Sequence, residues 1–222
     1  MVADIDDKSI IKILDWADEF EIPDLKWIEH DSYKRGGYFK GIPRDIEQLK
    51  SLTTLNLLGY QIPYLPKEIG RLINLNRLHL SGNKLIELPI EIKYLINLEE
   101  IYIPGNHLKS IPREIGLLTN LKVLILQENQ INDLPSEIGQ LVNLEVLELG
   151  GNRFASLPPE IGELKKLKIL TIWKNSLTSL PQEIDKLVNL KEFDCLYNKI
   201  ALTKSNLGWL NFLIEKECEI NI

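Results

Sequence analysis

Apolar and polar positions recur along the chain with a period of 23 residues, in a pattern close to LPxEIGxLxNLxxLxLxxNxLxx. Several apolar positions, a proline and an asparagine recur in phase, so chance periodicity is a negligible explanation. The sequence therefore predicts a stack of equivalent units across residues 42–202, with no gap or insertion. The seven units begin at Ile42, Leu65, Leu88, Ile111, Leu134, Leu157 and Leu180.

The LxxLxL segment of each unit predicts a short strand. Its apolar residues alternate with other residues, which is typical of a strand with one buried face. Stacked units would place these strands ~4.8 Å apart in a parallel sheet. Cys195 occupies a leucine position and is interpreted as a packing residue. The predicted buried rows are Leu78, Ile101, Leu124, Leu147, Leu170 and Phe193, and beside them Leu80, Ile103, Leu126, Leu149, Ile172 and Cys195.

Asparagine and proline mark the two ends of each unit. An asparagine follows the strand in units two to seven, where its amide can satisfy inward-facing peptide groups, and Tyr60 replaces it in the first unit. The proline suits the first position of a short helix, so a helical turn is predicted opposite the sheet. Two residues later each unit carries an acidic residue, such as Glu114. We interpret this column as complementing helix dipoles rather than as a cation-binding ladder.

This repeat resembles the leucine-rich-repeat family, and its LPxEIGxL half is similar to the 23-residue subclass found in Ras-pathway scaffolds and many bacterial proteins. The match covers about seven tenths of the chain. The resemblance implies an α/β fold: a horseshoe-shaped leucine-rich-repeat solenoid with a concave parallel sheet and short convex helical turns. It does not choose among a host-interaction effector, an intracellular scaffold and an adhesion protein, although the compact units look most like bacterial members.

The flanking segments have the composition of caps, which a solenoid needs because its core is open at both ends. Residues 1–41 are expected to form an N-terminal cap. It would begin with an amphipathic helix from Asp7 to Phe20 and continue as a turn-rich aromatic lid. The predicted apolar side of the helix is Ile10, Ile11, Leu14, Ala17 and Phe20, and the lid carries Trp27, Tyr33, Gly36, Gly37, Tyr38 and Phe39.

Residues 203–222 are expected to be a C-terminal cap and a degenerate eighth repeat. Ser205 is predicted to cap its helix. Cys218 lies 23 residues after Cys195, so the two cysteines would be neighbours on stacked strands if the register holds, with a buried thiol pair favoured over a disulfide. The helix carries Leu207, Trp209, Leu210 and Leu213, and the final strand alternates Cys218, Ile220 and Ile222.

Composition narrows the setting and the class of partner. A formal charge of −6 over 222 residues and a pI near 5.3 argue against a general nucleic-acid binder, which needs clustered cations. Two cysteines cannot form a disulfide framework, which favours a reduced cytoplasmic protein. The first residues lack the features of a secretory signal, and no apolar stretch predicts membrane insertion. Delivery as an effector stays open.

No motif predicts catalysis. The three histidines, His30, His79 and His107, have no partner at metal-site spacing. A phosphate-binding loop and a GxSxG elbow are also missing from the sequence. We therefore expect no catalytic residue, no cofactor and no metal, and the chain is not interpreted as an enzyme.

Function is expected to come from the strand positions that the repeat leaves free, which would form an exposed apolar patch on the concave face with a mixed polar rim. Valine and isoleucine there also simply suit strands, whereas a tryptophan in a usually polar slot favours binding. We expect a monomer that binds another protein; the alternative is a homodimer formed through the same patch. The predicted binding residues are Tyr102, Val123, Ile125, Val146, Glu148, Ile169, Thr171, Trp173, Leu196 and Tyr197.

Overall fold

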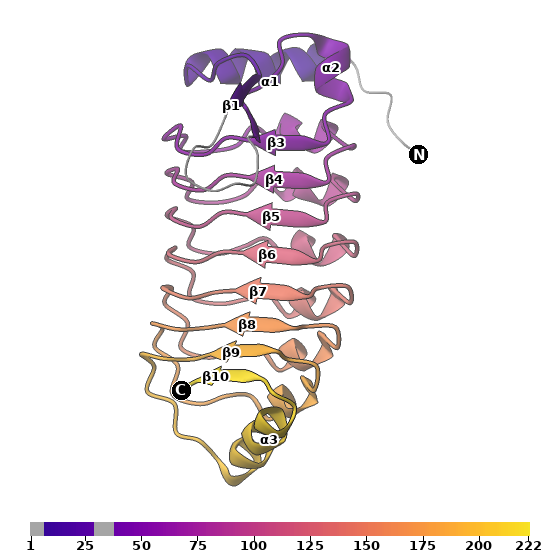
Figure 1. Cartoon of the computed structure of the whole chain (residues 1–222). Coiled ribbons are helices and arrows are strands. Elements are labelled where there is room, and N and C mark those ends of the chain that lie inside the picture. The colour runs from indigo at the N-terminus through magenta and orange to yellow at the C-terminus, as the bar shows by residue number, and fades with distance from the viewer. Residues whose placement is uncertain (1–6, 29–37) are drawn as a thin grey trace.

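The computed structural model describes residues 7–28 and 38–222 as a single stack of repeats with a helix at each end (Figure 1). Five-residue 3₁₀ turns, labelled η, lie opposite the strands. In chain order the elements are α1 (Asp7–Glu19), β1 (Lys26–Ile28), β2 (Tyr38–Lys40), α2 (Ile46–Lys50), β3 (Thr54–Asn56), η1 (Lys67–Arg71), β4 (Arg77–His79), η2 (Ile90–Tyr94), β5 (Glu100–Tyr102), η3 (Arg113–Leu117), β6 (Val123–Ile125), η4 (Ser136–Gln140), β7 (Val146–Glu148), η5 (Pro159–Glu163), β8 (Ile169–Thr171), η6 (Gln182–Lys186), β9 (Glu192–Asp194), α3 (Lys204–Glu215) and β10 (Glu219–Asn221).

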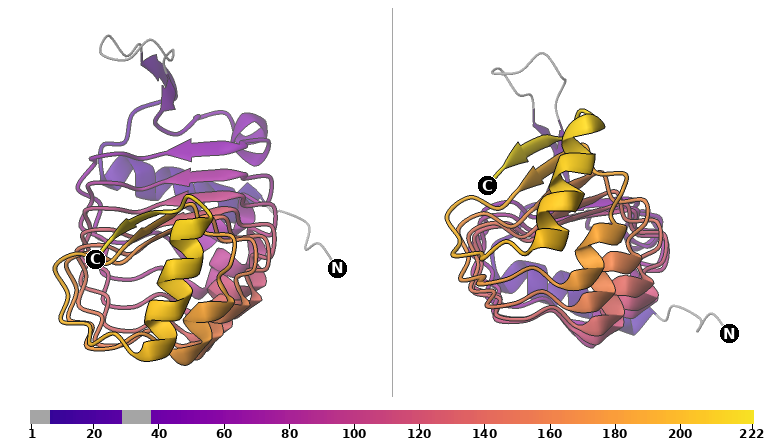
Figure 2. Two further views of the ribbon diagram at one scale, coloured as in Figure 1. Left: turned by 60° about the horizontal axis from the view of Figure 1, so that its bottom comes forward. Right: turned by 90° about the horizontal axis from the view of Figure 1, so that it is seen from below.

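An eight-stranded parallel sheet runs the length of the stack in the order β10-β9-β8-β7-β6-β5-β4-β3. From β3 to β9 each residue pairs with the residue 23 positions later, as in Leu78 with Ile101. Viewed along the stack, the strands lie on one side and the 3₁₀ turns on the other (Figure 2). The predicted buried rows are confirmed, since their side chains are at most 5% exposed. The predicted α/β solenoid, with the sheet on its concave face, is therefore correct.

Each repeat proline precedes its helical turn instead of opening it. The five-residue turns η1 to η6 begin one residue after a proline whose φ lies between −61° and −68° and whose ψ lies between 142° and 150°. That ψ is extended, so the proline stands at the N-cap and corrects the expected position by one residue. The first unit differs, because Asp45 caps the α-helix α2 by accepting a hydrogen bond from the Gln48 amide at 2.8 Å.

Glycine in the EIG motif allows successive turns to pack closely. A Cβ added to Gly116 would lie 2.6 Å from the carbonyl oxygen of Glu137 in the next turn, and Gly70 and Gly162 meet Glu91 and Glu183 in the same way. A side chain at these positions would overlap with the following unit. The acidic column therefore lies against the glycine column, and no group of acidic, histidine or cysteine side chains among the described residues has the arrangement of a metal site.

The asparagine column forms a hydrogen-bonded ladder, as predicted. Asn129 donates from Nδ2 to the carbonyls of Ile103 and Leu126 at 2.9 and 3.0 Å, and its Oδ1 accepts from the Leu108 amide at 3.0 Å. Each asparagine thus satisfies peptide groups in its own unit and in the preceding one. The pattern repeats at Asn83, Asn106, Asn152, Asn175 and Asn198.

Helix α1 covers the first repeat, but it is rotated relative to the predicted orientation (Figure 1). Ile10 and Ala17 are buried as expected, whereas Ile11 is 43% exposed. Ile13 and Trp16 are buried in its place, because positions 10, 13 and 17 share one face of a 3.6-residue helix.

Residues 26–28 and 38–40 form an antiparallel hairpin, β1–β2, and do not lie flat as a lid. The hairpin is joined to the sheet at its base, where Gly41 bridges Asn56, and it projects on the strand side of the solenoid (Figure 2). Antiparallel pairing satisfies the backbone of the two strands without the first repeat. Three of the predicted lid residues, Tyr33, Gly36 and Gly37, lie outside the described residues.

At the C-terminal end, α3 is capped by Thr203 through a capping box with Asn206, so the expected cap at Ser205 is wrong by two residues. Leu207 also departs from expectation and is 49% exposed. The helix contributes three buried side chains to the core, and β10 then adds the predicted edge strand parallel to β9. The buried apolar residues of α3 are Trp209, Leu210 and Leu213.

The two cysteines are free and are not neighbours. β10 pairs with β9 at an offset of 27 residues, as in Ile220 with Phe193, so Cys218 lies four positions out of register with Cys195. Four strand residues span about 13 Å, which is too far for a disulfide. Burial raises the pKa of the Cys195 thiol to about 11 and also raises that of Cys218, so both stay protonated at neutral pH.

Candidate binding face

The strand register places most of the predicted binding residues in two adjoining rows on the concave face. One row crosses the sheet from Tyr102 through Ile125 and Glu148 to Thr171. The second row lies beside it and consists of Val123, Val146 and Ile169. Because the intervening residues, Ile101, Leu124, Leu147 and Leu170, point into the core, the side chains of both rows point outward.

These side chains are half-buried, so the expected exposed patch is a partly covered one. Tyr102, Val123, Ile125, Val146 and Ile169 fall between the buried and exposed classes. Neighbours ~4.8 Å away on adjoining strands cover the flanks of each side chain and leave its outer end in contact with solvent. The face is therefore a continuous and closely packed apolar surface.

Trp173 lies just beyond β8 and crosses the neighbouring repeat. A Cβ built on Gly150 would overlap the indole ring, and the ring also approaches Gly151. Gly150 is buried beneath the ring, while Trp173 itself stays half-buried. The tryptophan therefore has a packing role in addition to the binding role expected for it, and the glycine in the preceding unit makes that position available.

Leu196 and Tyr197 lie after β9, at the C-terminal margin of the face. The amide of Leu196 donates to Asp194 Oδ1 at 3.0 Å. Tyr197 has a positive φ of 58° and is 80% exposed, which makes it the most exposed of the predicted residues. Gly59, Gly82, Gly105 and Gly151 hold the same left-handed position in other units, so glycine there reflects a tight turn.

Polar side chains on the N-terminal part of the face pair with one another. Arg77 contacts Glu100 at 3.1 Å, and the Tyr102 hydroxyl donates to Glu100 at 3.0 Å. His79 stacks on the Tyr102 ring with centroids 4.3 Å apart. Burial, reinforced by Glu100, raises the pKa of Tyr102 to about 12, and burial lowers the pKa of His79. Both rings are neutral at physiological pH.

The C-terminal part of the face is acidic. Glu148 on β7 and the pair Glu192 and Asp194 on β9 flank β8. Burial raises the pKa of Glu148, and the negative charge of Glu192 raises it further. By contrast, the predicted polar rim is internally neutralised, because Lys122 contacts Glu99 at 2.8 Å and Lys168 contacts Glu145 at 2.6 Å.

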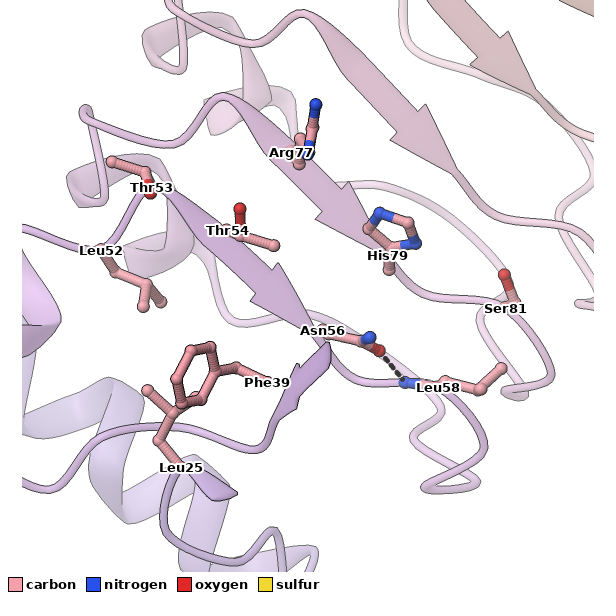
Figure 3. A pocket seen from close by; sticks show the side chains of 10 residues that line it. All are labelled: Leu25, Phe39, Leu52, Thr53, Thr54, Asn56, Leu58, Arg77, His79 and Ser81. Atoms are coloured by element: carbon pink, nitrogen blue, oxygen red, sulfur yellow. Dashed lines mark hydrogen bonds between the residues drawn. The ribbon is translucent and has the colours of Figure 1, made fainter. Parts of the chain in front are cut away.

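A hollow of about 590 Å³ lies where the hairpin meets the concave face (Figure 3). Leu25 and Phe39 form one side, and Arg77 and His79 approach from the sheet (Figure 3). Phe39 is 53% exposed. The sequence pattern did not indicate this hollow, because it depends on how the hairpin leaves the first repeat.

Several large apolar side chains are exposed outside the concave face. Tyr94 and Leu117 hold equivalent positions at the ends of η2 and η3, and Ile96 and Val142 follow the turns of their units. Each is more than half exposed. Sequence analysis missed them, although their signal was present as apolar residues at variable positions of LPxEIGxLxNL.

Among the described residues, no helix is long and apolar enough to cross a membrane. The arrangement also brings no nucleophile together with a base on the concave face, where Thr171 and the paired Arg77, Glu100 and Tyr102 are the nearest approach to a polar cluster besides the carboxylates. The surface has the chemistry of a recognition face: apolar rows, aromatic rings and charges at its margins.

Comparison with known proteins identifies the repeat. A leucine-rich repeat region model matches residues 105–213, and a leucine-rich repeat model matches residues 74–95. No curated protein gives a significant match to the sequence.

Among solved structures, the chain is similar to a leucine-rich-repeat protein of Leptospira interrogans, with 35% identity and a TM-score of 0.56 over 75% of this chain and 54% of that one. It thus spans about half the length of that protein. The ectodomain of an Arabidopsis thaliana membrane receptor kinase, solved in complex with Casparian strip integrity factor 2, shares 28% identity and a TM-score of 0.66 over 74% of this chain and 21% of that one.

An internalin of Listeria monocytogenes has the same fold, with 21% identity and a TM-score of 0.67 over 79% of this chain and 49% of that one. Family models, solved structures and the hydrogen-bonded asparagine ladder agree on one assignment. The chain belongs to the leucine-rich-repeat family, with 23-residue repeats of the bacterial type.

Proposed function

We propose that the chain is a non-enzymatic protein-binding module whose partner is another protein held on the concave face. The observation that carries this proposal is the pair of adjoining apolar rows on β5 to β8, which end at the half-buried indole of Trp173. Tryptophan and tyrosine are the side chains most enriched at binding hot spots. The binding residues are those predicted from the sequence, from Tyr102 to Tyr197.

The stacked repeats support this proposal energetically. The asparagine ladder and the fully buried leucine rows fix the strands before a partner arrives. A preorganised surface loses less conformational entropy on binding. Leucine-rich repeats commonly act as interaction modules, and the Arabidopsis ectodomain was solved with a bound factor.

The proposal extends to the setting of the protein. Two buried, protonated thiols that lie out of register support a reducing compartment, for which we propose the cytoplasm. The negative net charge and the carboxylates at the C-terminal end of the face disfavour nucleic acid as a partner. We propose a monomer in the absence of the partner.

Affinity capture with matched double variants tests the function. The full chain, a Trp173→Glu/Ile125→Glu variant and a Tyr94→Glu/Leu117→Glu variant would be used as baits, with captured proteins identified by mass spectrometry. Both variants add two carboxylates in place of large apolar residues, one pair on the concave face and one on the outer side. Thermal unfolding of each bait would verify that it is folded.

We expect a protein that is retained by the full chain and the outer variant and lost by the concave variant. Equal capture by all three baits would contradict the proposal. Self-association through the same face is the competing function, and a concentration-dependent mass in light scattering that the concave variant abolishes would favour it.

A further inference from the structure

Three carboxylates surround one short side chain at the C-terminal end of the concave face. Thr171 on β8 pairs with Glu148 on β7 and with Asp194 on β9, so it stands between two acidic residues in one row. Glu192 lies in the adjoining row beside Ile169. The strands of Glu148 and Asp194 are two spacings apart, about 10 Å, and the smaller threonine separates them.

None of these carboxylates has a cation. In the described residues, Glu148, Glu192 and Asp194 form no ion pair, although Glu145 and Glu99 on the rim each contact a lysine. The hydrogen bonds recorded for Glu148 and Asp194 are with neutral groups, the Gln127 side chain and the Leu196 amide. Partly buried carboxylates that repel each other raise the free energy of the unbound face.

The Thr171 hydroxyl adds an independent observation. Thr171 is only 5% exposed, and its Oγ1 has no hydrogen-bond partner within the described part of the chain. Because Leu170 points into the core, Thr171 points outward, between the two carboxylates. A covered hydroxyl oxygen without a donor is costly unless a ligand supplies one.

Trp173 adds an aromatic ring two residues along the same strand direction. Its indole lies across Gly150, on the Glu148 side of the cluster, and stays half-buried. Aromatic faces attract cations, and tryptophan does so most strongly. Val146 and Ile169 continue the surface as apolar neighbours.

We infer that this acidic cluster receives an arginine or lysine side chain of the partner polypeptide, which places its charge between Glu148 and Asp194 and its aliphatic stem against Ile169 and Trp173. Arginine fits best, because its planar group has five donors, enough to contact both carboxylates and the Thr171 oxygen together. This inference rests on the proposed function, since it assigns the chemistry of the partner segment held on the same face.

The first test uses a small probe that needs no knowledge of the partner. Indole N–H resonances of the ¹⁵N-labelled full chain would be followed while N-acetylarginine amide, or its neutral isostere N-acetylcitrulline amide, is added. The arginine probe is expected to shift the Trp173 resonance, with binding at least about tenfold tighter than that of the citrulline probe.

Matched variants define the site. Glu148→Gln/Asp194→Asn keeps the shapes of both side chains and removes the charges, and we expect it to abolish the preference for arginine. Glu87→Gln/Asp133→Asn makes the same charge change at exposed positions elsewhere and should leave the preference intact. Equal shifts from both probes, no shift from either, or an arginine preference that survives in the Glu148/Asp194 variant would overturn the inference.

The captured partner provides the second test. Its affinity is expected to fall about tenfold or more with Glu148→Gln/Asp194→Asn and to stay unchanged with the control pair. Unchanged affinity in both variants, with capture still lost in the Trp173/Ile125 variant, would overturn the cation site and leave the proposed function standing. Arginine-amide binding with capture that ignores the concave face would overturn the function and leave only a site for small cations.

Discussion

In the N-terminal half of the concave face the polar side chains satisfy one another, whereas in the C-terminal half several carboxylates lack a cation. Arg77, Glu100, Tyr102 and His79 form one connected cluster of an ion pair, a hydrogen bond and a ring stack. Glu148, Glu192 and Asp194 have no such arrangement among the described residues. Both halves use the same strands and spacing.

This contrast shows how one repeat supports two kinds of surface. The repeat fixes the backbone and the buried leucines, and only the variable strand positions decide whether charge is neutralised internally or left for a partner. A satisfied cluster gains little from further contacts, whereas unpaired charges and a covered hydroxyl gain considerably from a complementary group. Binding energy is therefore expected to concentrate in units five to seven.

The largest expected effect tests whether the scaffold is equivalent in the two halves. Asn106→Ala and Asn152→Ala each remove hydrogen bonds to buried carbonyls and amides in neighbouring units. We expect each to lower the free energy of unfolding by about 2–4 kcal/mol, because each leaves several buried groups unpaired. Chemical denaturation would measure both, and a difference of more than half between them would break the equivalence.

Gly150→Ala is expected to have the next largest effect, because the added methyl group would overlap the Trp173 ring. A loss of about 1–3 kcal/mol in the free energy of unfolding is expected from overpacking. The matched control is Gly208→Ala in α3, where an added Cβ meets open space and helix propensity favours alanine. Equal effects of the two substitutions would show that the indole does not pack on Gly150.

In the N-terminal half, Tyr102→Phe removes the hydroxyl that donates to Glu100 and keeps the ring on which His79 stacks. We expect a loss of about 0.5–1.5 kcal/mol in the free energy of unfolding and no change in partner affinity. Thermal unfolding and a binding titration would measure the two quantities. A large loss of affinity would place the N-terminal half inside the interface and remove the contrast.

Much of the fold follows from the sequence because the repeat constrains it seven times over. The strands, their buried rows and the asparagine ladder each depend on positions that recur in phase, such as Leu124 and Asn129. The rotation of α1, the hairpin β1–β2 and the offset of β10 occur once each, outside the periodic pattern. Their geometry depends on packing at one end of the stack, which no periodicity records.

The binding face was predictable as a set of positions but not as a set of environments. Alternation along the strands places Ile125 and Ile169 outward without reference to a structure. It does not reveal that Trp173 crosses Gly150, that Thr171 lacks a hydrogen-bond partner, or that Arg77 is already paired. Those features depend on side chains from neighbouring units meeting in three dimensions.

The smallest expected effect concerns the titration of Glu148 in the C-terminal half. Its pKa is raised by folding, so the protonated form is favoured in the folded state, and the associated stabilisation is present at acid pH and lost as pH rises through the folded pKa. Glu148→Gln should therefore increase the melting temperature slightly at pH 7. The gain should disappear as pH falls through that pKa, as thermal unfolding at several pH values would show.

If the melting temperatures of the wild type and Glu148→Gln changed in parallel at all pH values, Glu148 would not be destabilised by its surroundings. That result would weaken the contrast between the halves without affecting the fold. Glu87→Gln, at an exposed position, provides the control for the change in net charge.

Methyl NMR of the full chain with the captured protein tests the central claim most directly. Ile125 and Ile169 lie on the concave face, while Ile90 and Ile96 are exposed on the outer side. We predict that the partner shifts the methyl resonances of Ile125 and Ile169 and leaves those of Ile90 and Ile96 in place. Shifts confined to Ile90 and Ile96 would contradict binding on the concave face and place the interface on the outer side.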